Sequence, residues 1–123
     1  MQNISSPAIQ NFIVAANKEI GSYWERMKLT YAPAPTIVAR ETERYIVLHK
    51  EGKNHEGQKT DESIFAFIVR GDFYTRTLGV LKEGDILRPA TYKAPAKHAR
   101  GNVFSEQGGT EAIAQGSASI RYL

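Results

Sequence analysis

Cysteine is absent from this chain of 123 residues. That absence excludes disulfide bonds, thiolate catalysis and zinc sites built on cysteine, and it fits a reducing cytoplasm. Long apolar runs are missing as well, and none approaches the roughly 18 residues that a membrane span requires. The N-terminus, MQNISSPAIQ, lacks a basic start followed by an apolar core. We therefore expect no secretory signal and no membrane partner.

Catalytic motifs are also missing. The three histidines, His49, His55 and His98, are far apart in sequence, and none has a partner at metal-ligand spacing. No zinc-binding His-Glu motif, nucleophile elbow or glycine-lysine phosphate loop is present. The acidic residues lie mostly in polar turns and on a helix face, where solvation explains them. We therefore predict that the protein is not an enzyme and carries neither a cofactor nor a metal.

The first part of the chain predicts a long amphipathic helix in a single domain that spans residues 1–123. Ser6 and Pro7 are typical of an N-cap and a first helical position. Pro33 and Pro35 end the helix near residues 29–31. Between these limits, apolar residues recur at helical spacing: Ile9, Phe12, Ile13, Ala16, Ile20, Tyr23, Trp24 and Met27. This stripe either packs on a sheet or contacts another subunit.

The rest of the chain is typical of β-structure. Residues 36–40 and 44–50 are predicted to pair as strands, whereas the polar residues 50–62 predict an exposed loop. The nearly continuous apolar run 63–70 predicts a central strand. Further strands are expected at 73–81, 86–92 and 118–123, and short helical turns at 95–100 and 110–115. The predicted fold class is α+β: a long N-terminal amphipathic helix packed on an antiparallel β-sheet, with short helical turns near the C-terminus.

The most informative stretch is the run of residues 86–105, ILRPATYKAPAKHARGNVFS. It contains no acidic residue, and its arginines and lysines are Arg88, Lys93, Lys97 and Arg100. The whole chain carries a net charge of +3, so the remainder is slightly negative. Cations interleaved with an aromatic residue suit a surface that binds phosphates and stacks a base. The alternative is a solvated basic turn.

Residues 84–102, GDILRPATYKAPAKHARGN, and the ending IRYL resemble the conserved block of a family of small phage proteins, the Thoeris anti-defence sponges of the first type. The resemblance covers residues 84–123. It implies a phage protein in the cytoplasm of the infected bacterial host. Such a protein binds cyclic ADP-ribose isomers made by TIR-domain enzymes and holds them without degradation. Some family members also capture cyclic di- or trinucleotides of CBASS immunity at a second site.

The resemblance also implies ligand-binding residues. The family pocket pairs an aromatic residue with an asparagine ten positions later and an arginine near the C-terminus. Tyr92, Asn102 and Arg121 stand at that spacing, and Tyr92 would replace a phenylalanine while keeping its stacking face. Earlier arginines contribute in the family as well, and Arg26 and Arg70 are our hypotheses for them.

A cyclic ADP-ribose isomer carries a pyrophosphate, an adenine and two riboses. Arginine has a planar fork that can engage two phosphate oxygens at once, so we expect Arg100 and Arg121 to bind the pyrophosphate. Lys97 would add a more mobile point charge. Asn102 can donate and accept hydrogen bonds at a ribose or adenine edge. Alternatively, Arg100 only counters nearby carbonyls and Asn102 only occupies a turn.

Affinity considerations predict an oligomer. Nanomolar binding requires about −12 kcal/mol, more than a shallow surface on one small domain usually supplies. We therefore expect a homo-oligomer, from a dimer to a hexamer, that encloses the ligand between subunits. Two other functions stay open. The basic run would also serve a small phage protein that binds DNA or RNA, although we do not expect nucleic acid as the partner. A phage assembly protein would use Trp24 and the helix stripe as its contact.

Overall fold

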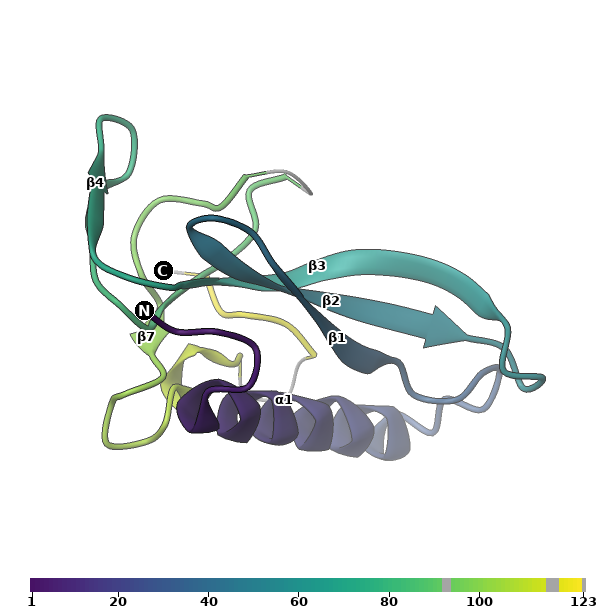
Figure 1. The fold of residues 1–123 in the computed structure, drawn as a ribbon. Helices are drawn as coiled ribbons and strands as arrows, with labels where there is room; N and C mark the ends of the chain where they lie inside the picture. Colours follow the sequence, from purple (N-terminus) through teal and green to yellow (C-terminus); the bar gives the residue numbers. More distant parts are fainter. Residues whose placement is uncertain (92–93, 115–117, 123) are drawn as a thin grey trace.

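The computed structural model describes residues 1–91, 94–114 and 118–122. In these ranges a helix, α1 (Pro7–Arg26), packs on an antiparallel sheet with the strand order β1-β2-β3-β6-β7 (Figure 1). The strands of this sheet are β1 (Thr36–Glu41), β2 (Tyr45–Lys53), β3 (Lys59–Val69), β6 (Asp85–Leu87) and β7 (Gly101–Asn102). The predicted α+β class is confirmed. No helix within the described ranges has both the length and the apolar character that crossing a bilayer demands.

The helix begins where the sequence predicts and ends a few residues earlier than expected. Ser6 has extended backbone angles, φ −60° and ψ 134°, and Pro7 follows as the first helical residue. The chain leaves the helix because Lys28 adopts a left-handed conformation with φ 55°. The backbone N–H of Leu29 then donates to the carbonyl of Trp24 at 3.1 Å, which satisfies a helix-end carbonyl. The prolines at 33 and 35 lie beyond this stop.

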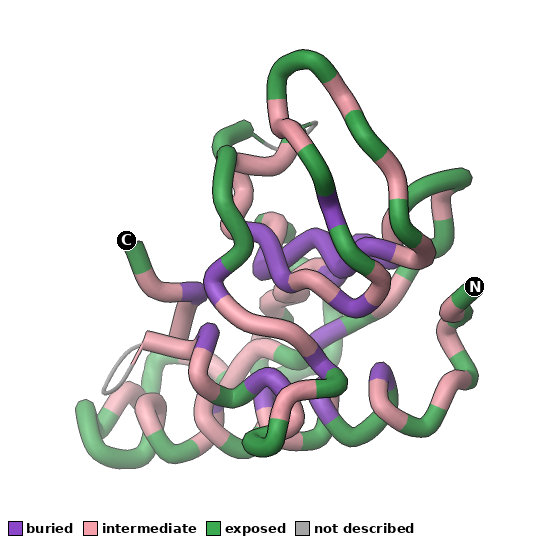
Figure 2. Tube along the Cα trace, turned by 90° about the vertical axis from the view of Figure 1, so that its left-hand side faces the viewer, coloured by how far each residue is buried: buried purple, intermediate pink, exposed green. Residues whose placement is uncertain are grey.

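The sheet has an apolar core on each face. The helix stripe packs on one face, where its inner residues are fully buried: Ile9, Phe12, Ala16 and Ile20. Ile120 is buried in the same core, so the C-terminal segment contributes to it. A hydrogen bond from the backbone N–H of Ile37 to Asn17 Oδ1, at 2.9 Å, also ties the edge strand β1 to the helix. Figure 2 shows the buried segments gathered in the strands and along the helix.

The opposite face is covered by a small hairpin of β4 (Phe73–Thr75) and β5 (Gly79–Leu81), which stands away from α1 in Figure 1. Leu81 and Phe73 of this hairpin pack on Phe67 of β3 in the second core. The prediction of one strand over residues 73–81 is therefore wrong. The chain turns back after Thr75 because its Oγ1 accepts the backbone N–H of Leu78 and Gly79 takes φ 78°.

The prediction of an exposed loop over residues 50–62 is also wrong for most of that stretch. β2 continues to Lys53 and β3 begins at Lys59, so only residues 54–58 form the turn. Asn54 organises this turn, since its Oδ1 accepts the backbone N–H groups of Glu56 and Gln58. The side chains at this end of the hairpin are polar and show no strand pattern in the sequence. Backbone pairing stabilises the strands there.

The last third of the chain departs most from the predicted elements. The strand expected at 86–92 is reduced to β6, and residues 95–100 form no helical turn, because His98 has φ 71° and breaks any helical path. The turn expected at 110–115 appears as η1 (Thr110–Ala112). The strand expected at 118–123 is replaced, in its described part, by an isolated bridge between Ile113 and Ile120.

Candidate anion-binding site

Three arginines meet where the end of the sheet joins the C-terminal segment. Arg88 directly follows β6, and Arg100 directly precedes β7, the neighbouring strand. Arg121 lies in the C-terminal segment, and its Nη2 donates to the carbonyl of Arg100 at 2.8 Å. We call Arg88, Arg100 and Arg121 the arginine cluster. Pairing of β6 with β7 brings Arg88 and Arg100 together, and the hydrogen bond from Arg121 to Arg100 adds a charge from 21 positions later in the sequence.

Arg100 is the buried member of the cluster, with 7% of its surface exposed. Its backbone N–H donates to the carbonyl of Ile86 at 2.8 Å and fixes the residue beside β6. Its Nη1 donates to the carbonyls of Lys97 and His98, so the side chain does counter nearby carbonyls, as the alternative interpretation held. Its Nε is buried and has no hydrogen-bond acceptor among the described residues. That N–H is an unsatisfied donor inside the described part of the fold.

The cluster is not neutralised within the described part of the chain. The ion pairs found there involve other residues, and no carboxylate pairs with a cluster guanidinium. Burial lowers the pKa of Arg100, and the positive charges of Arg88 and Arg121 lower it further. Arginine nevertheless stays protonated at neutral pH. The three like charges repel one another, and a bound anion would relieve that repulsion.

Glu111 lies beside the cluster without pairing with it. Its backbone carbonyl accepts the Nε–H of Arg121 at 2.9 Å, while its carboxylate turns toward the loop before η1. There Oε2 accepts the backbone N–H of Asn102 at 3.1 Å, and Oε1 accepts the hydroxyl of Ser105 at 2.8 Å. Burial opposes ionisation of this carboxyl, but these hydrogen bonds outweigh it and lower the pKa. Glu111 therefore holds the loop in place.

An exposed aromatic residue, Tyr122, lies against Arg88 of the cluster. The guanidinium of Arg88 lies 3.5 Å from the ring centroid of Tyr122, within cation–π distance. The Nη1 of Arg88 also donates to the carbonyl of Ile120, which holds the C-terminal segment against β6. Tyr122 is 74% exposed, and an exposed aromatic ring can stack a base. Arg88 and Tyr122 are not among the predicted ligand-binding residues, although the acid-free run and the IRYL ending contain them.

An open hollow of about 540 Å³ lies beside Arg121, a size within the range of small-molecule sites. Its other described walls come from α1 and from the segment around η1: Glu19, Gln107, Thr110, Glu111, Ile113 and Ala114. Amide and hydroxyl groups among them can bind ribose hydroxyls. The two carboxylates in the wall disfavour an anion at that end, so the arginine side is the more favourable place for a negatively charged group.

The remaining predicted residues have different surroundings. Lys97 is exposed, and its backbone carbonyl accepts a hydrogen bond from Nη1 of Arg100. Tyr92 lies outside the described residues. Arg26 is exposed at the end of α1, where its guanidinium lies 5.9 Å from the Tyr23 ring centroid. Arg70 donates from Nη1 to the carbonyl of Thr42 at 2.7 Å.

Two of the predicted ligand-binding residues, Arg70 and Asn102, make hydrogen bonds within the fold. Arg70 also donates from Nε to the carbonyl of Gln2, so it joins the N-terminal segment to the β1–β2 turn. The side chain of Asn102 donates to the carbonyl of Glu83 and to Asp85 Oδ1, at 2.9 and 3.0 Å. Its Oδ1 accepts the backbone N–H of Phe104 at 2.7 Å. The Asn102 amide therefore works as a turn residue in this structure.

No protein family, curated protein or solved structure matches this chain. Membership of the sponge family stays a prediction that rests on the motif. In the described residues no group of three or more histidines and acids could hold a metal ion. The fold and the site together define an α+β protein with a candidate anion-binding arginine cluster.

Proposed function

We propose that this protein binds a cyclic ADP-ribose isomer at the arginine cluster and holds it without degrading it. In that role it would be a phage protein that blocks Thoeris immunity in the host cytoplasm. The observation that carries the proposal is the cluster itself, which combines three guanidiniums with no paired carboxylate among the described residues. A pyrophosphate has the charge and the oxygen geometry to match such guanidiniums.

The ligand parts correspond to different groups around the cluster. The pyrophosphate would accept hydrogen bonds from guanidinium N–H groups of Arg88 and Arg121, which are only partly buried. The adenine would stack on the exposed Tyr122 ring. The alternative is the sequence-based prediction that it stacks on Tyr92. The polar wall near Arg121 suits the riboses.

Retention of an intact ligand is consistent with the chemistry beside the cluster. Hydrolysis needs a general base within hydrogen-bond reach of an attacking water. The Glu111 carboxylate is engaged by Asn102 and Ser105, and its lowered pKa makes it a weak base. Arginine is protonated at neutral pH and cannot accept a proton.

Enclosure between subunits remains part of the proposal. The hollow beside Arg121 is open to solvent on one chain, and a second copy would bury more of the ligand and slow its escape. We propose a homo-oligomer, from a dimer to a hexamer. Light scattering on the eluting protein measures this directly, and a monomer at micromolar concentration with unchanged affinity would contradict it.

Calorimetry with purified cyclic ADP-ribose isomers tests the proposed function. Arg121→Gln and Arg88→Gln each remove one charged donor group, so we expect affinity to fall by about tenfold to a hundredfold. Arg76→Gln, at an exposed position of the β4–β5 turn, is the matched control and should bind normally. Heating the complex should release the ligand chemically unchanged. Absence of heat with every isomer, or recovery of a linear product, would reject the proposal.

A further inference from the structure

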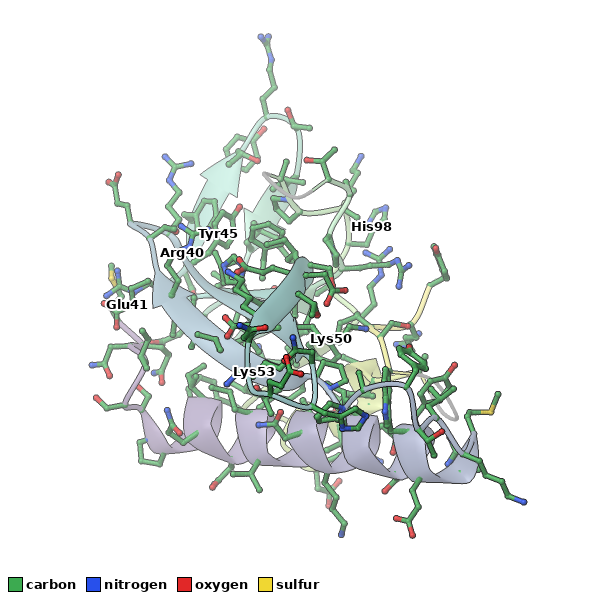
Figure 3. All side chains as sticks on the ribbon, turned by 90° about the vertical axis from the view of Figure 1, so that its right-hand side faces the viewer. Arg40, Glu41, Tyr45, Lys50, Lys53 and His98 are labelled. Carbon is green, nitrogen blue, oxygen red and sulfur yellow. The ribbon has the colours of Figure 1, made fainter. Side chains whose placement is uncertain are left out.

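A second cavity lies at the end of the sheet that carries the β2–β3 turn, and it has no part in the proposed function. Its volume is about 340 Å³, within the range of small-molecule sites. It lies between the C-terminal end of α1, the paired ends of β2 and β3, and Ala118. Figure 3, which looks onto this end, shows the cavity residues Lys50 and Lys53 of β2 above the helix.

One side of this cavity is aromatic. Tyr23, Trp24 and Tyr31 line it together with two prolines. The Trp24 ring is held in place, since its Nε1 donates to the carbonyl of Ala32 at 2.9 Å. Its ring centroid lies 5.5 Å from that of Tyr31, with the rings tilted by 53°. An aromatic wall fixed in this way suits a flat apolar ligand better than a flexible aliphatic one.

The other side is charged. The Lys50 ammonium is half-buried, donates to the carbonyl of Ala118 at 2.9 Å and pairs with no carboxylate among the described residues. Burial lowers the pKa of Lys50, while the negative charge of Asp61 acts in the opposite direction. Lys53 adds a second, exposed ammonium to the lining. Two ammoniums against one carboxylate leave the lining with one net positive charge.

A half-buried ammonium without an anionic partner carries a desolvation cost that a bound anion would offset. The position of Lys50 is fixed by strand pairing. Within the sheet it lies between Ile37 of β1 and Ser63 of β3. Asp61 at the same end disfavours a second negative charge. From this combination we propose that the cavity binds a planar aromatic molecule with a single carboxylate, its ring against Trp24 and its carboxylate on Lys50.

The chain provides its own reporter for this site, because Trp24 is its sole tryptophan. The probe is trans-cinnamate, with the neutral trans-cinnamamide and the dianion 4-carboxycinnamate as comparisons. Trp24 emission and calorimetry should both register cinnamate, and the amide should bind about tenfold more weakly because it lacks the charge. The dianion should also bind more weakly than cinnamate. Equal binding of cinnamate and its amide, or no binding of cinnamate by either method, overturns the proposal.

Variants distinguish the loss of a binding contact in the cavity from a general loss of folding. Lys50→Met should lose cinnamate binding, Lys50→Arg should retain it, and Lys18→Met, on the exposed face of α1, should leave it unchanged. Thermal unfolding of each variant shows whether it is folded. Undiminished binding by a folded Lys50→Met variant contradicts the assignment, as does loss of binding in a folded Lys50→Arg variant.

Discussion

Replacement of Glu111 by glutamine tests how the loop beside the arginine cluster is held. The carboxylate accepts the backbone N–H of Asn102 at 3.1 Å and the hydroxyl of Ser105 at 2.8 Å. The amide keeps the shape but loses the charge, and its NH2 group cannot accept a hydrogen bond, so one of the two positions loses its acceptor. Glu111 is half-buried, so we expect the free energy of unfolding to fall by about 1–2 kcal/mol at pH 7.

The pH dependence of this effect follows from the direction of the pKa shift. The pKa of Glu111 is lower in the folded protein than in the unfolded chain, so the folded state favours the ionised form. Its contribution is complete above the unfolded value, about 4.3 for glutamate, and it is lost as the pH falls through the folded pKa. The difference between wild type and Glu111→Gln should therefore shrink in acid.

Urea unfolding of both proteins at pH 7 and at successively lower pH measures this difference. Glu106→Gln is the matched control, because Glu106 lies in the same loop with an exposed side chain, and its replacement should change stability little. A Glu111→Gln variant as stable as wild type at pH 7 would refute the reasoning. So would a difference that stays constant as the pH falls.

Four further outcomes are expected. Gly84→Ala should lower stability by about 1–3 kcal/mol, since Gly84 has φ 87° and a Cβ there would lie 2.6 Å from the Phe104 ring. Gly21→Ala, which meets nothing within 4 Å, should instead stabilise α1 by about 0.5–1 kcal/mol in the same urea titrations. Asn102→Ala should lower the urea midpoint because it removes three hydrogen bonds from the turn; an unchanged midpoint with lost nucleotide binding would assign Asn102 to the ligand. Affinity for the cyclic nucleotide should change mildly with salt, whereas a steep dependence, with tight uptake of long duplexes, would identify a nucleic-acid-binding protein.

Local sequence signals were sufficient for the helix and the central strands. Ser6 and Pro7 mark the start of α1, and its apolar stripe is the face buried on the sheet. The apolar run at 63–70 is the buried end of β3. These elements were predictable because burial imposes a period on the side chains that each element presents to the core.

The polar ends of paired strands and the turns between strands were not predictable in the same way. The ends of β2 and β3 are exposed and polar, and backbone hydrogen bonds between them hold a strand pair that no apolar pattern marks. The pattern at 73–81 predicts one strand and not the β4–β5 hairpin, because the turn depends on Thr75 and Gly79 acting together. At 95–100 the backbone N–H of Arg100 bonds to β6, and this distant partner replaces a local helical turn.

The sequence alone indicated which side chains carry positive charge near the C-terminal end and that few acids accompany them. Arg100 and Arg121 are both predicted to bind the pyrophosphate, and the structure places them in contact, since Arg121 donates to the carbonyl of Arg100. Only the tertiary structure added Arg88 to them and turned the Asn102 amide toward its own turn. Charge is a property of each residue, whereas the partner of a hydrogen bond depends on which segments folding brings together.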